Sequence, residues 1–387
     1  QQSFDLQQAA QRFLSGSVDA LNACYECCDR HALPGQIALF WQGKDGRKEQ
    51  YTFRELQQRA SQFANFLKSQ GVSKGDRVSG LLPRTPELII TILATWRIGA
   101  VYQPLFTAFG PKAIEHRLQL AQSKLVVTDI GNRDKLQEVD GCPAIVTVTG
   151  AKGTGLYQGD YSFWAEVNRQ SDQCELVMMN LQDPFLLMFT SGTTGPAKPL
   201  QVPLKALIAF GGYMQDAIGL RAEDSFWNIA DPGWAYGLYY GITGPLLLGH
   251  PTIFYEGAFT ADSLCQIVND YGVNNLAGAP TAYRMMMAAD PKQMAKLRGK
   301  FRVVSSAGEP LNPEVFRWFK QVLDAPIYDH YGQTEVGMVV CNHHALEHEV
   351  RAGSAGFASP GYRVVALDEQ GNELGADTPG ILAVDIS

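Results

Sequence analysis

The chain has 387 residues, of which 45% are hydrophobic, so it is long and apolar enough for two or three subdomains with buried cores. Its net charge of -7 argues against a protein that coats nucleic acid, because such binding depends on clustered Lys and Arg. The longest apolar run, residues 88–96, is too short for a membrane span. No signal peptide is visible, and seven scattered cysteines favour free thiols, so we expect a cytoplasmic protein.

Two clusters of cysteine and histidine could in principle bind a metal. The first is "CYECC" at residues 24–28, and the second is "CNHHALEHE" at residues 341–349. No second Cys or His pair follows the first cluster at zinc-ligand spacing, and its neighbours suit an amphipathic helix. The second cluster has no independent anchor elsewhere in the chain. We therefore expect a structural helix and a solvated loop.

Helix and strand signals alternate through the first part of the chain. In residues 52–71, Thr52 and Glu55 have capping-box spacing, and Gly71 stands where a C-terminal cap belongs. Residues 85–99 form a second predicted helix, because a threonine and a proline precede its apolar run and a glycine follows it. Short strands are expected at residues 76–82, 100–105, 124–129 and 144–150.

The same alternation resumes after a polar stretch at residues 150–180. Strands are expected at residues 184–190, 225–230, 252–255, 274–279 and 301–308, and helices at 203–219 and 312–323. This order predicts two doubly wound α/β sheets, mostly parallel and flanked by helices. The end differs, since residues 361–375 and 380–386 read as strands without helices between them, which predicts a small antiparallel, barrel-like subdomain. The expected limits are 1–170, 171–335 and 336–387.

Three polar segments follow predicted strands, where an open α/β sheet presents ligand-binding groups. The first is "FTSGTTGPAKP" at 189–199, whose glycines, hydroxyls and Lys198 suit phosphate oxygens, although it does not match the Walker pattern. Alone it could equally be a hydroxyl-rich turn. The others are "SSAGEPLNPE" at 305–314 and "YDHYGQTE" at 328–335. Together, and in this order, the three favour a nucleotide site.

These three motifs resemble those of the AMP-forming acyl-CoA synthetase superfamily, and the resemblance covers nearly the whole chain. Residues 101–118 and "ADPGWAYGLYYG" at 230–241 are similar to the branch that contains acetyl-CoA and medium-chain acyl-CoA synthetases. The resemblance implies that a carboxylic acid and ATP form an acyl adenylate, from which the thiol of coenzyme A displaces AMP. It implies ATP, Mg²⁺ and coenzyme A as cofactors or substrates. The net charge and the short apolar runs predict no nucleic-acid partner and no membrane span.

The resemblance also implies roles for individual residues. Those expected to hold the β- and γ-phosphates are Thr190, Ser191, Gly192, Thr193, Thr194, Gly195 and Lys198. Those expected around the adenine are Gly308, Glu309, Pro310, Asp329, His330 and Tyr331, and Gly332 and Gln333 are also expected among the cofactor-binding residues. Thr334 would contact the α-phosphate and Glu335 would bind the metal, and both join Lys198 as the expected catalytic residues.

One position in the last motif indicates the size of the acid. Where acetate-specific relatives have a tryptophan that closes the acyl pocket, this chain has Gly332. Each additional buried methylene adds roughly 0.8 kcal/mol to binding, so we expect a medium-chain or compact branched or ring acid. Trp234, Tyr236 and Gly237 would line or gate the pocket, although core packing is nearly as good an explanation for the aromatic residues.

Two departures from the family pattern bear on activity. Pro199 follows Lys198 where the family usually has glycine, which removes a backbone donor and could reorient the lysine. The chain ends before the segment that would supply a ribose-binding Asp and before the small C-terminal domain with the catalytic lysine, so that domain is expected to be absent here. Two alternatives therefore remain: a catalytically silent nucleotide-binding module, and an adenylation domain that loads a carrier protein.

Overall fold

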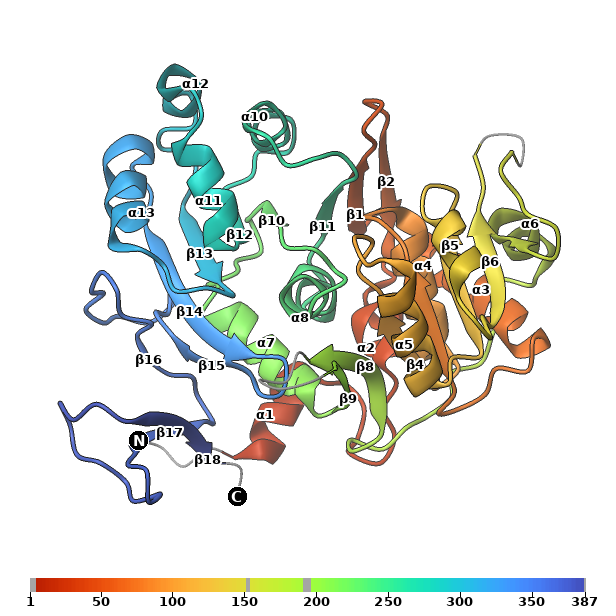
Figure 1. Cartoon of the computed structure of the whole chain (residues 1–387), viewed down its shortest axis with the longest axis horizontal. Coiled ribbons are helices and arrows are strands. Elements are labelled where there is room, and N and C mark those ends of the chain that lie inside the picture. Colours follow the sequence, from red (N-terminus) through yellow and green to blue (C-terminus); the bar gives the residue numbers. More distant parts are fainter. Residues whose placement is uncertain (1–4, 151–153, 191–195, 386–387) are drawn as a thin grey trace. The chain divides into compact units, whose positions relative to one another are not determined.

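The computed structural model describes residues 5–150, 154–190 and 196–385, and Figure 1 shows the order of its elements. By its internal contacts the chain divides into two compact units. Unit 1 comprises Gln1–Arg12, Ile208–Ile229 and Phe259–Ser387, and unit 2 comprises Phe13–Leu207 and Ala230–Ala258. The sequence-based limits of 1–170, 171–335 and 336–387 differ from these bounds and stay a prediction about independently folding parts.

Unit 2 is built on a seven-stranded sheet in the order β7-β6-β5-β3-β4-β8-β9. All neighbouring strands are parallel except the last pair, so β9 is an antiparallel edge strand. The strands are β3 (Arg77–Leu81), β4 (Val101–Pro104), β5 (Leu125–Asp129), β6 (Ala144–Val148), β7 (Tyr161–Ser162), β8 (Pro184–Thr190) and β9 (Lys198–Pro203). The predicted parallel sheet is confirmed, and the hairpin of β8 and β9 places residues 190 and 198 opposite each other.

The helices of unit 2 begin and end largely where the sequence signals predict. Thr52 and Glu55 form the predicted capping box, and Gly71 has a φ of +78°. The helices are α2 (Ala23–Cys27), α3 (Phe53–Ser69), α4 (Pro86–Arg97), α5 (Pro111–Ala121), α6 (Phe163–Arg169), α8 (Ala235–Leu238) and α9 (Gly244–Leu247), with 3-10 turns at Asp29–His31 and Arg133–Glu138 and a π turn at Tyr239–Thr243.

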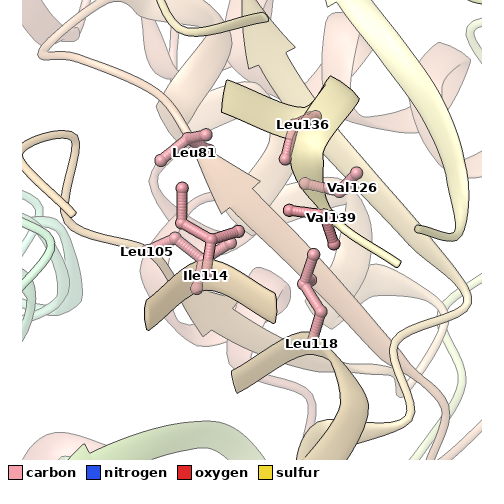
Figure 2. Close-up of a cluster of buried hydrophobic side chains, with 7 residues drawn as sticks. All are labelled: Leu81, Leu105, Ile114, Leu118, Val126, Leu136 and Val139. Carbon is pink, nitrogen blue, oxygen red and sulfur yellow. The ribbon is translucent and has the colours of Figure 1, made fainter. Parts of the chain in front are cut away.

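Apolar side chains fix α5 on the sheet of unit 2. Ile114 and Leu118, four residues apart on one face of α5, pack with side chains from β3, β5 and the segments around them, as Figure 2 shows. The whole cluster consists of Leu81, Leu105, Ile114, Leu118, Val126, Leu136 and Val139. Burying a side chain of this kind contributes roughly 1.5–3 kcal/mol, so this face of α5 is firmly held.

A second, three-stranded sheet in unit 2 was not predicted. Its order is β11-β1-β2, with β1 (Ile37–Gln42), β2 (Lys48–Thr52) and β11 (Thr252–Tyr255). Residues 252–255 were expected as a strand, but their parallel pairing with β1 could not be anticipated, because the two strands are more than 200 residues apart.

Unit 1 contains a six-stranded sheet in the order β10-β12-β13-β14-β15-β16. The first four strands are parallel and the last two are antiparallel additions. The strands are β10 (Phe226–Asn228), β12 (Asn275–Gly278), β13 (Val303–Ala307), β14 (Ile327–Gln333), β15 (Gly337–Cys341) and β16 (Phe357–Ala358). The helices are α1 (Leu6–Phe13), α7 (Ala206–Asp216), α10 (Ala261–Tyr271), α11 (Pro280–Met287), α12 (Pro291–Ala295) and α13 (Pro313–Trp318), which a π turn at Phe319–Leu323 follows.

The predicted antiparallel segment near the C-terminus is present as a two-stranded sheet. β17 (Arg363–Leu367) pairs with β18 (Ile381–Asp385). Residues 361–375 were expected to turn back on themselves, and they do so briefly: Leu367 and Glu373 make an antiparallel bridge, and the N–H of Leu374 donates to the carbonyl oxygen of Ala366. The predicted small antiparallel sheet near the C-terminus is therefore confirmed.

Both cysteine and histidine clusters are structural. Cys24, Cys27 and Cys28 are buried in or beside α2. The expectation of a solvated loop for the second cluster is wrong, because Cys341 and His343 are buried. Across residues 5–150, 154–190 and 196–385, no group of three or more His, Cys, Asp or Glu side chains could hold a metal ion. No helix in the same ranges is long and apolar enough to cross a membrane.

Candidate active site

Two of the three predicted motifs lie side by side in unit 1. β13 and β14 are parallel neighbours, with Ser306 opposite Asp329 and Ala307 opposite His330. The loop of residues 308–310 therefore leaves the sheet next to the end of β14. Gly308 has a φ of +97°, which a residue with a side chain rarely adopts, so the glycine lets the chain turn here.

Asp329 ties this loop to β14. Its Oδ2 accepts a hydrogen bond from the N–H of Leu311, at 3.1 Å, directly after the loop. Its Oδ1 is buried and accepts no hydrogen bond from the described residues. Burial raises the pKa of the Asp329 carboxyl to about 6, although the bond from Leu311 acts in the opposite direction.

His330 holds the strand from the other side and is not exposed to a ligand. Its side chain is 2% exposed. Nδ1 lies 2.7 Å from the hydroxyl of Tyr213, and Nε2 lies 2.9 Å from the carbonyl oxygen of Asn342. Burial lowers the pKa of His330 to about 3, so the imidazole is neutral near pH 7. The His330 side chain therefore supports β14, and the expected place of this residue near the adenine stays a prediction.

The carboxylate of Glu309 is held by α11. Oε1 accepts a hydrogen bond from Thr281 Oγ1 and Oε2 accepts one from Arg284 Nη2, both at 2.8 Å. These bonds lower the pKa of Glu309, with Arg284 as the main cause. The sequence did not single out Thr281 and Arg284, because nothing local connects them to a loop about 25 residues away.

The end of β14 exposes polar and aromatic groups. The ring of Tyr331 is 37% exposed, and its hydroxyl accepts a hydrogen bond from Gln333 Nε2 at 3.1 Å. An exposed ring fixed in this way can stack on a planar base. Thr334 and the exposed Glu335 follow in the turn that leads to β15.

Gly332 permits a close approach within the β14–β15 hairpin. The register of the two strands shifts between Tyr331 and Gly332. A Cβ added at Gly332 would lie only 2.3 Å from the carbonyl oxygen of Gly337 and 2.7 Å from Met338 Sδ. The hairpin itself therefore requires a glycine here, independently of any acyl pocket.

The third motif belongs to unit 2. Thr190 ends β8 and Lys198 begins β9, and the two residues pair across the hairpin. Lys198 is exposed, while Ser191, Gly192, Thr193, Thr194 and Gly195 lie outside the described residues. Pro199 is accommodated because β9 is an edge strand, where a missing N–H costs least.

The three expected acyl-pocket residues in unit 2 divide into two kinds. Trp234 is 43% exposed, and its ring centroid lies 5.6 Å from those of Phe106 and Phe109. Tyr236 is buried against Tyr240, with ring centroids 5.8 Å apart, as core packing requires. A Cβ at Gly237 would lie 2.2 Å from the carbonyl oxygen of Asp231, so this glycine permits another close backbone approach.

Glu335 fits the chemistry of a magnesium ion that accompanies a nucleotide. Mg²⁺ prefers hard oxygen ligands and is commonly held by one or two carboxylates together with substrate phosphates and water. An exposed carboxylate in the turn after β14 meets this requirement without a preformed cluster of protein ligands.

Comparisons with known proteins identify the family. The family model described as AMP-binding enzyme matches residues 26–385. The acetyl-coenzyme A synthetase of Bacillus subtilis (strain 168) is 36% identical, over 98% of this chain and 67% of that protein. That of Halorhodospira halophila is 33% identical, over 99% of this chain and 63% of that protein.

A solved structure is similar over the same range. The crystal structure of Brucella canis acyl-CoA synthetase matches with a TM-score of 0.96 at 56% identity, over 99% of this chain and 70% of that chain. The chain thus spans between 59% and 67% of the curated relatives compared. The match of the family model over most of the chain shows that it belongs to the AMP-binding enzyme family.

Proposed function

We propose that this chain binds ATP and supports the activation of a carboxylic acid as an acyl adenylate. In the first step a carboxylate oxygen attacks the α-phosphorus of ATP and pyrophosphate leaves. In the second step the thiol of coenzyme A attacks the acyl carbon and AMP leaves. The observation that carries the proposal is the juxtaposition of residues 308–310 and 329–333 at the ends of two parallel strands.

The described residues support distinct parts of the first step. The exposed ring of Tyr331 would stack on the adenine beside the loop that Asp329 and Glu309 hold in place. Lys198 would offset the negative charge of the phosphates, and Thr334 would donate to the α-phosphate. A bound magnesium ion, with Glu335 as a protein ligand, would supply further charge neutralisation.

The size of the acid is a separate part of the proposal. Gly332 supports an acid longer than acetate, because a tryptophan at this position closes the pocket of acetate-specific relatives. Two further observations bear on the size of the acid. The hairpin needs glycine at this position for its own packing, and the curated relatives are named acetyl-coenzyme A synthetases. Their names, and that of the Brucella canis acyl-CoA synthetase, support coenzyme A as the acceptor rather than a carrier protein.

The test is acid-dependent exchange of pyrophosphate into ATP by the full-length protein. Acetate, butyrate, hexanoate, octanoate, isobutyrate and benzoate would each be supplied with ATP and Mg²⁺. We expect exchange with at least one acid, and a maximum beyond acetate. A maximum at acetate would overturn the interpretation of Gly332 alone, whereas binding of ATP without exchange for any acid would favour a silent nucleotide-binding module.

A further inference from the structure

Helix α5 contacts the hairpin that carries Lys198 at two places, the end of β8 and the start of β9. At the end of β8, the ring of Phe189 lies 6.4 Å from the ring of His116 and 5.6 Å from the guanidinium carbon of Arg117. At the start of β9, His116 Nε2 lies 3.0 Å from the carbonyl oxygen of Ala197. A carbonyl oxygen can only accept, so this contact is a hydrogen bond when Nε2 carries the proton.

The apolar side of Ala197 is fixed as well. It packs against a small cluster of buried residues to which α5 contributes Ala121 and β8 contributes Leu187 and Phe189. Ala197 is therefore held by its methyl group and by its carbonyl oxygen, immediately before Lys198. The helix is itself anchored, because Ile114 and Leu118 of α5 are buried in the cluster that Figure 2 shows.

We propose that His116 is a positioning residue that orients Lys198 towards the phosphates of ATP by holding the Ala197 carbonyl. Lys198 itself pairs with Thr190 across the hairpin, and the contact with His116 holds the residue directly before it. The hydrogen bond from His116 is then a main determinant of the backbone position from which the Lys198 side chain extends. This proposal rests on the proposed function, since it assumes that Lys198 meets the β- and γ-phosphates.

Loss of the hydrogen bond from His116 should weaken the binding of nucleotides that carry β- and γ-phosphates more than the binding of AMP. Losing one hydrogen bond of ordinary strength changes a free energy by about 1 kcal/mol, and 1.4 kcal/mol corresponds to a tenfold change in Kd. We therefore expect His116→Phe, which keeps an aromatic ring against Phe189 but has no donor, to weaken MgATP binding about 5- to 10-fold. Binding of AMP, which lacks the β- and γ-phosphates, should change less than about 2-fold.

Two further variants separate positioning from general structure. His116→Gln retains a donor with similar reach and should restore MgATP affinity to within about 2-fold of the wild type. His31→Phe is a control outside the hairpin. His31 Nε2 lies 3.1 Å from the carbonyl oxygen of Leu247 and accepts a hydrogen bond from Arg30 Nε, and its ring lies against Phe53. This substitution should lower thermal stability without changing MgATP affinity.

The measurement is isothermal titration calorimetry of MgATP and AMP with the full-length wild type and the three variants. The proposal fails if His116→Phe binds MgATP as the wild type does, if it loses MgATP and AMP affinity equally, or if His116→Gln is as impaired as His116→Phe. If the wild type binds neither nucleotide, the proposed function fails instead, so the two outcomes are distinguishable.

Discussion

The strongest test of the local geometry is the substitution Gly332→Ala. The added Cβ would lie 2.3 Å from a main-chain oxygen, roughly 1 Å closer than ordinary van der Waals contact, and 2.7 Å from Met338 Sδ. The thioether can swing away, but the Gly337 carbonyl belongs to the backbone of β15 and can move only with the strand. Overpacking of this kind typically costs about 1–3 kcal/mol, and we expect that loss in the free energy of unfolding.

The control is Gly212→Ala in the same unit. Gly212 lies in α7, and a Cβ there would meet nothing within 4 Å, so the same substitution should stabilise the protein by about 0.5–1 kcal/mol. Urea unfolding of both variants measures the free energies, and hydrogen exchange in residues 327–341 locates the loss. If Gly332→Ala is as stable as the wild type and changes only the preferred acid, the hairpin explanation is refuted and the glycine serves the acyl pocket.

Three further predictions concern residues of the motifs at 189–199 and 328–335. His330→Ala should lower the free energy of unfolding by about 2–4 kcal/mol, because it removes the hydrogen bond to Tyr213 and leaves a cavity. Urea unfolding measures this loss, and a loss below about 0.5 kcal/mol would contradict a structural role. The native pKa of Asp329 is raised to about 6. Between about pH 4 and 6 the native state therefore binds more protons than the unfolded state. The free energy of unfolding of the wild type should consequently fall, relative to that of Asp329→Asn, as the pH rises through this window. Urea midpoints at pH 4, 5, 6 and 7 test this, and a constant difference between the two proteins would rule it out. Lys198→Ala and Glu335→Gln should each reduce pyrophosphate exchange about 10- to 1,000-fold. Urea midpoints should stay unchanged, because both side chains are exposed. A fall in the urea midpoint that accompanies the loss of exchange would point to a structural role.

Much of the fold follows from patterns that are local in the sequence. The capping box of Thr52 and Glu55 and the buried runs at residues 184–190 and 301–308 depend on neighbours within a few positions. The three-stranded sheet of unit 2 depends instead on the pairing of β1 with β11, which local periodicity cannot indicate. The register in which residues 363–367 pair with residues 381–385 is likewise not indicated by local periodicity.

The candidate site shows the same division. The residue types at the strand ends could be identified from sequence, and the parallel pairing of β13 with β14 brings two of the motifs together. The groups that hold them could not be identified in this way. Arg284 belongs to no motif, and Leu311 and His116, although they lie within quoted segments, act through contacts that only the folded chain makes. His330 illustrates the converse, since it lies within a motif but points into the interior.

The most direct test of the account is acid-dependent incorporation of labelled pyrophosphate into ATP by the full-length protein. The account predicts exchange that requires ATP, Mg²⁺ and a carboxylic acid together and that is strongly reduced in Lys198→Ala. Exchange that is absent with every acid in a broad panel, from a folded protein that nevertheless binds ATP, would contradict it.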